Sequence, residues 1–126
     1  WVEIGQTPYG ELGTQLGRAS VLAIPTPAHA YWDSVAPVKL FDYLAAGRPV
    51  VSTPRTETAA ILRERGVGLV SDGDGAEALA APIAELLEDP DRARRMGAAA
   101  REAAERDYDW AAIGERLATE IVARIR

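Results

Sequence analysis

The stretch SVAPVKLFDYLAAGRPVVST, residues 34–53, decides the fold of this chain. Pro37 suits the first position of a helix, where the N–H that proline lacks has no partner anyway. Gly47 suits the left-handed residue that ends a helix, and the apolar run over residues 49–53 is typical of a buried strand. The stretch therefore predicts a helix over residues 37–46 followed by a strand.

Apolar runs and helical patterns alternate on both sides of this stretch. An apolar run over residues 20–25 precedes it, so the order is strand, loop, helix, strand, as in a parallel sheet. We expect an α/β fold, a Rossmann-like parallel sheet of about four strands with about six flanking helices. The other strands are predicted over residues 1–5 and 67–71, and the other helices over residues 9–18, 56–65, 75–88, 90–106 and 109–125.

Composition limits the class of protein. The 126 residues correspond to one domain, and 48% hydrophobic with 26% charged residues is ordinary for a soluble globular chain. A net charge of −5 argues against a nucleic-acid partner, because phosphate backbones attract basic surfaces. The lack of cysteine fits a reducing compartment. We expect a cytoplasmic protein, at most peripheral at the inner face of a membrane.

The start of the chain lacks an initiator methionine and the pattern of a signal peptide. No apolar run approaches the roughly 18 residues of a membrane-spanning helix. We therefore expect residues 1–126 to form a single, truncated domain of something longer.

The helix predicted over residues 37–46 carries its two charges on one face. Lys39 and Asp42 lie three positions apart, and at about 100° per residue they fall on the same side. One interpretation is an exposed ion pair. The other is that Asp42 accepts hydrogen bonds from paired hydroxyls while Lys39 meets a phosphate. The opposite face, which we expect to pack on the sheet, carries Leu40, Phe41, Leu44 and Ala45.

The loop before this helix is a candidate anion site. The first N–H groups of a helix have no partner within it, and the helix dipole favours negative charge there. Ser34, Val35 and Ala36 lead into the helix and could present such groups to a phosphate. The alternative is that the side chain of Asp33 or Ser34 caps the helix.

Three further features have ordinary structural explanations. Glu57 suits the first turn of a helix, where the dipole favours an acid. His29 is the only histidine and has no neighbour that suggests a metal or a catalytic triad. The run Asp72-Gly73-Asp74-Gly75 lacks the spacing of a calcium loop and predicts a turn with a helix cap. No metal ligand, cofactor or catalytic residue is assigned.

The run APVKLFDYLAAGRPVVST resembles the signature of retaining glycosyltransferases of the GT-B fold, in particular family 4. In that family the donor half carries the run Pro-x-Lys-Leu-Phe-Glu-Tyr-Met-Ala-x-Gly-x-Pro-Val-Val. The resemblance covers essentially the whole chain, from the strand that ends at Gly5 to a terminal helix that starts near an aromatic-Trp pair. It implies part of a GT-B C-terminal domain.

The resemblance implies roles for particular residues. Asp42 matches the acid that binds the ribose hydroxyls of a nucleotide sugar, and residues 34–36 match the backbone that meets its diphosphate. Glu57 matches a loop acid near the sugar. The family spacing puts the first acid of its usual pair at Ser34, and the acidic residue here is Asp33, one position earlier.

The resemblance also implies parts that these residues do not contain. The family has an acceptor domain and two further βα units whose Arg and Lys clamp the phosphates, and the terminal helix, here residues 107–126, crosses to the acceptor domain. The two units would place strands between residues 1–5 and 20–25. We therefore expect a rearranged four-stranded sheet or a homodimer formed by strand or helix exchange.

These observations predict the donor-binding part of a retaining glycosyltransferase. Its donor would be a nucleoside-diphosphate sugar, with UDP or GDP as the nucleotide, and no metal ion is expected. The isolated piece would be inactive. The alternatives are a non-catalytic Rossmann or flavodoxin-like binding module and a GT-B nucleotide-sugar epimerase.

Overall fold

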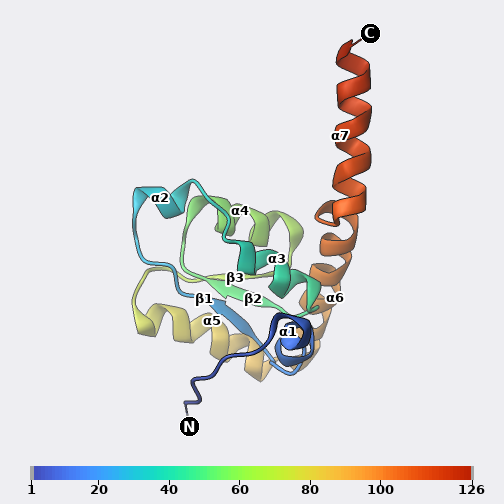
Figure 1. Cartoon of the computed structure of the whole chain (residues 1–126). Coiled ribbons are helices and arrows are strands. Elements are labelled where there is room, and N and C mark those ends of the chain that lie inside the picture. Colours follow the sequence, from blue (N-terminus) through green and yellow to red (C-terminus); the bar gives the residue numbers. More distant parts are fainter. Residues whose placement is uncertain (1, 126) are drawn as a thin grey trace.

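The computed structural model describes residues 2–125 as an α/β fold, in which helices cover both faces of a parallel three-stranded sheet (Figure 1). The strands β1 (Leu22–Ile24), β2 (Val50–Ser52) and β3 (Gly68–Val70) lie in chain order, and Ala23, Val51 and Leu69 are in register. The predicted fold class is confirmed. The helices are α1 (Tyr9–Leu16), α2 (Ala30–Asp33), α3 (Val38–Ala45), α4 (Thr56–Arg65), α5 (Ala76–Glu88), α6 (Pro90–Asp107) and α7 (Trp110–Ile125).

The central strand divides the core into two halves. Val50 and Val51 are both fully buried and point to opposite faces, since successive strand side chains alternate. On one face, Val50 packs with residues of α3, α4 and α6, including Leu40 and Leu62. On the other face, Val51 packs with Leu86 of α5 and the start of α6. The sheet is therefore buried on both sides, as its continuous apolar strands predict.

The strand predicted over residues 1–5 is wrong for residues 2–5. Residues 2–8 have no regular structure, and Ile4 is 96% exposed. A strand is stable where a neighbouring strand accepts its backbone hydrogen bonds, and no strand in the described part of the chain pairs with this segment. The four-stranded sheet does not form between residues 2 and 125, whereas exchange between two chains stays a prediction. Residue 1 lies outside the described residues.

The loop between β1 and α3 contains a short helix that the sequence pattern did not predict. His29 caps this helix, α2, because its Nδ1 accepts a hydrogen bond of 3.2 Å from the backbone N–H of Tyr31. One turn of helix is too short to show apolar periodicity. His29 therefore has a structural role as a helix cap.

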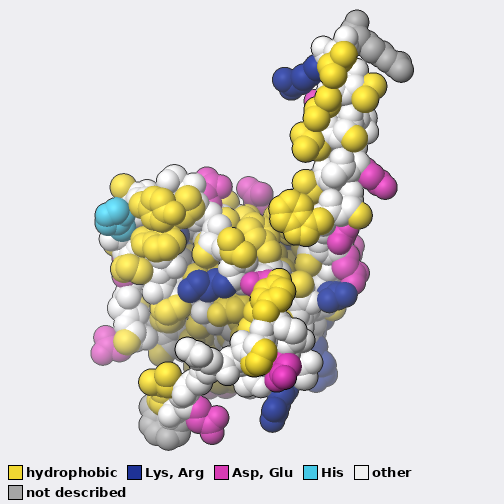
Figure 2. Space-filling view, in the orientation of Figure 1, with side chains coloured by type: hydrophobic (Ala, Val, Ile, Leu, Met, Phe, Trp, Pro, Cys, Tyr) yellow, Lys and Arg dark blue, Asp and Glu magenta, His cyan; other side chains and the backbone are white. Residues whose placement is uncertain are grey.

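The terminal helix α7 projects away from the rest of the molecule (Figure 1). Asp109 caps its start by accepting hydrogen bonds from the backbone N–H groups of Ala111 and Ala112. Its apolar side chains line the exposed helix (Figure 2), and Trp110 is 85% exposed. That this helix crosses to another domain stays a prediction. None of the helices between residues 2 and 125 is long and apolar enough to span a membrane.

Candidate functional site

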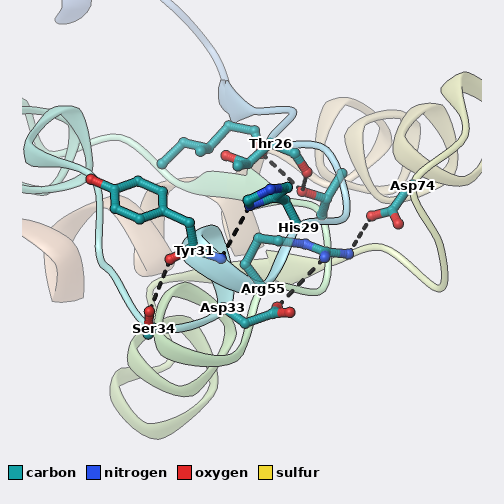
Figure 3. Close-up of polar contacts among 9 residues, drawn as sticks. Thr26, His29, Tyr31, Asp33, Ser34, Arg55 and Asp74 are labelled. Carbon is teal, nitrogen blue, oxygen red and sulfur yellow. Dashed lines mark hydrogen bonds and ion pairs between the residues drawn. The ribbon is translucent and has the colours of Figure 1, made fainter.

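Three loops meet at the edge of the sheet where the strands end. They follow β1, β2 and β3 and run over residues 25–37, 53–55 and 71–75. Side-chain hydroxyls tie them to neighbouring backbone: Thr53 Oγ1 donates to the carbonyl oxygen of Thr26 at 2.6 Å (Figure 3), and Ser71 Oγ lies 2.7 Å from that of Gly73. In open parallel sheets, ligands bind beyond this edge.

The amino end of α3 is not capped by a protein side chain. Pro37 occupies the N-cap position, and no side chain within residues 2–125 bonds to the first turn. Ser34 instead ends α2, because its hydroxyl and its N–H both donate to the carbonyl oxygen of Tyr31. Asp33 pairs with Arg55. The alternative in which Asp33 or Ser34 caps α3 is therefore wrong.

Several backbone N–H groups remain available at this helix end. Among the residues that the structure describes, no protein acceptor bonds to the N–H of Val35, Ala36, Val38 or Lys39. Such groups and the helix dipole favour an anion. The amino end of α3 thus has the chemistry that a phosphate requires.

Lys39 and Asp42 do not pair with each other, so the ion-pair interpretation is wrong. Lys39 is exposed, and neither side chain forms an ion pair within the described chain. Asp42 instead faces a cavity of about 410 Å³ between α1 and α3. Burial and, secondarily, the negative charge of Asp42 raise the pKa of the neighbouring Tyr43. The cavity is lined by Tyr9, Leu12, Gly13, Leu16, Asp42, Ala45, Ala46 and Arg101.

Arg55 is the residue that the sequence reasoning missed. Its side chain is only 8% exposed and lies between Asp33 and Asp74 (Figure 3). The Nη2 atom is 2.5 Å from Asp74 Oδ1, and the Nη1 atom is 3.5 Å from Asp33 Oδ1. A charged residue in the short loop after a buried strand was the available signal, because that loop lies at the ligand edge of a parallel sheet.

Of the remaining candidates, Asp74 belongs to this cluster and Glu57 does not. Glu57 is exposed in the first turn of α4 and forms no ion pair with any described residue, so its role near a sugar stays a prediction. Residues 72–75 form a bend that ends at Gly75, the N-cap residue of α5, and no side chain of the described residues caps this helix. Asp74 of this run pairs with Arg55. A further cavity, lined by Arg48, Pro49 and Arg94 among others, lies at the amino ends of the strands and away from these loops.

The fold and the family match define a glycosyltransferase domain of the GT-B type. Residues 14–119 match the family model described as "Glycosyl transferase-like", and the chain belongs to this family. Sucrose-phosphate synthase from Thermosynechococcus elongatus has a similar fold, with a TM-score of 0.79 at 23% identity over 97% of this chain and 29% of that one.

Two curated relatives are similar over most of the chain. A GDP-mannose-dependent monoacylated alpha-(1-6)-phosphatidylinositol monomannoside mannosyltransferase from Corynebacterium glutamicum is 31% identical over 121 residues, which cover 90% of this chain and 30% of the relative. A D-inositol 3-phosphate glycosyltransferase from Thermobispora bispora is 30% identical over an alignment of 134 residues, which covers 91% of this chain and 31% of the relative. The chain therefore spans about 30% of the length of these relatives.

Proposed function

We propose that this chain is the donor-binding part of a retaining glycosyltransferase that uses a nucleoside-diphosphate sugar. Membership of the glycosyl transferase-like family supports sugar transfer as the reaction. The observation that carries the donor role is the uncapped amino end of α3, with Lys39 and Asp42 on the same helix and neither engaged in an ion pair between described residues. Protein groups leave this end available for a ligand.

The positions of these groups along α3 indicate how a nucleotide would lie on the helix. Asp42 lies four residues after Val38, a rise of about 6 Å along the axis. The diphosphate binds the N–H groups at the start of α3, and the ribose hydroxyls donate to the Asp42 carboxylate in the cavity beside α1. Lys39 lies between the start of α3 and Asp42 in the sequence and adds a positive charge. The charge that develops on the leaving diphosphate is stabilised by groups that are already oriented.

GDP-mannose is the first donor to test. The Corynebacterium relative and two mycobacterial relatives are named as GDP-mannose-dependent enzymes. The groups that select the base, the sugar and the acceptor lie beyond the sheet edge formed by residues 25–37, 53–55 and 71–75. We propose that the acceptor binds another domain of the whole protein, that α7 packs against that domain, and that residues 1–126 alone have no transferase activity.

The test is a calorimetric titration of the protein that contains this chain with GDP and with UDP. Asp42→Asn should lower the affinity for the nucleotide by about tenfold or more, because each hydrogen bond to a charged acceptor contributes about 1.5–3 kcal/mol. Glu64→Gln is the matched control, since Glu64 is exposed on α4 and outside the site. Unchanged affinity in Asp42→Asn would overturn the assignment.

Product analysis separates transfer from the alternative reactions. A transferase releases free nucleoside diphosphate from the nucleotide sugar when the acceptor is present. An epimerase returns a nucleotide sugar with an altered sugar, and a binding module releases nothing. We expect free GDP or UDP and a rate that EDTA leaves unchanged, because Lys39 and the helix N–H groups supply the positive charge.

A further inference from the structure

Arg55 occupies the middle of the ligand edge and is held rigidly by its own backbone. Its N–H donates to the carbonyl oxygen of Thr53 at 2.8 Å, and its carbonyl oxygen accepts from the N–H of Ala59 at 2.7 Å. It is the N-cap residue of α4, three positions after the last residue of the central strand. The backbone of Arg55 is therefore tied to the end of the central strand and to the first turn of α4.

The guanidinium joins loops that follow the two outer strands. Asp33 is the last residue of α2, in the segment after β1, and Asp74 comes from the loop after β3. These carboxylates are 43% and 38% exposed, whereas Arg55 lies beneath them at 8%. A buried charge is costly unless it is paired, so this contact constrains both loops. The planar fork of arginine reaches two acceptors at once, which the compact ammonium of lysine does not.

The contact is uneven and leaves one donor unused. Asp74 lies at 2.5 Å from the guanidinium and Asp33 at 3.5 Å, near the limit of an ion pair. The buried Nε of Arg55 has no hydrogen-bond partner within the described residues. Asp74 is thus the stronger anchor, and it sets how Arg55 is presented to Asp33. Asp33 directly precedes the residues that lead into α3.

We propose that Arg55 is a positioning residue: anchored by Asp74, it holds Asp33 and thereby the 34–36 backbone in the arrangement that receives the donor diphosphate. This inference rests on the proposed donor function. It assigns no contact between Arg55 and the ribose, which would bind at Asp42 farther along α3. Loss of the contact that Arg55 makes with Asp33 and Asp74 should therefore weaken binding of the diphosphate more than binding of the nucleoside.

The experiment compares diphosphate and monophosphate ligands of the same nucleoside. The protein that contains this chain is titrated with GDP and GMP, or with UDP and UMP if uridine nucleotides bind. Asp74→Asn and Arg55→Lys should each lower the affinity for the nucleoside diphosphate by about fivefold or more, which is within the typical range of coupling between sites. The affinity for the nucleoside monophosphate should fall by less than half of that factor. Asp74→Asn leaves Arg55 paired with Asp33, so it remains informative if Arg55→Lys does not fold.

Asp72→Asn is the matched control. Asp72 lies two positions from Asp74 in the same loop, is exposed, and forms no ion pair within residues 2–125. It should bind both ligands as the wild type does. Equal losses for diphosphate and monophosphate, or no loss, would overturn the positioning role while the donor function stands. A wild-type protein that binds neither nucleotide would overturn both.

Discussion

Gly97 on α6 lies directly against the carbonyl oxygen of Gly47, which follows the C-cap residue of α3. A Cβ atom on Gly97 would collide with that oxygen. Gly47 has φ of +67°, a conformation that glycine adopts without strain and that residues with a side chain rarely adopt. This close approach sets how α3, the helix of the proposed donor site, packs on α6.

Gly97→Ala should therefore destabilise the fold. We expect a loss of about 1–3 kcal/mol in the free energy of unfolding, as for other overpacked positions. Urea denaturation measures it. Gly114→Ala is the control, because nothing lies within 4 Å of a Cβ there and alanine favours a helix by up to about 1 kcal/mol. Equal effects of the two substitutions would show that the contact with Gly47 does not matter.

Thr53→Val should loosen the ligand edge at nearly constant shape. It removes the hydroxyl that donates to the carbonyl oxygen of Thr26 at 2.6 Å, in a residue that is almost fully buried. Leaving that acceptor unsatisfied costs about 1–3 kcal/mol. Thermal unfolding should show the loss. The exposed Thr14 provides the control, and Thr14→Val should change stability by less than about 0.5 kcal/mol.

Lys39→Ala should raise the KM for the nucleotide-sugar donor by about fivefold to tenfold. The expected cause is the loss of a positive charge beside the diphosphate, so the effect should shrink at high salt. Arg63→Ala removes an exposed cation elsewhere, on α4, and should leave KM unchanged. Steady-state kinetics at two ionic strengths tests both. The same KM in Lys39→Ala and wild type would contradict the proposed phosphate contact.

The end of α6 should carry a pH-dependent contribution to stability. A hydrogen bond from Arg106, followed by the charges of Arg106, Arg65 and Arg116, lowers the pKa of Asp107 from its ordinary 3.8, against the effect of burial. Asp107 also pairs with Arg65 at the end of α4.

A lowered pKa in the folded state means that stabilisation is present above the ordinary value and is lost as pH falls through the folded one. Asp107→Asn should therefore lower Tm at neutral pH. The difference from wild type should shrink below pH 3.8. A Tm difference that is independent of pH would contradict this origin.

Local signals predicted most of the elements. The predicted ends of α4 agree with the structure, and those of α3 agree within one residue, because proline, glycine and apolar periodicity act over a single turn of chain. The segment 2–5 failed for the opposite reason. Its pattern is suited to a strand, but a strand needs a neighbour, and that condition is not local.

The candidate site shows the same division. The sequence by itself determined that α3 would begin at an anion-favouring end and carry Lys39 and Asp42 on one face, since these properties follow from the helical repeat. Only the tertiary structure decided that Ser34 ends α2, that Asp33 turns to Arg55, and that the amino end of α3 stays uncapped. The Asp33 contact depends on a partner across the sheet edge, whereas Ser34 bonds to Tyr31 within its own segment. Sequence spacing does not encode which of several nearby donors and acceptors will meet.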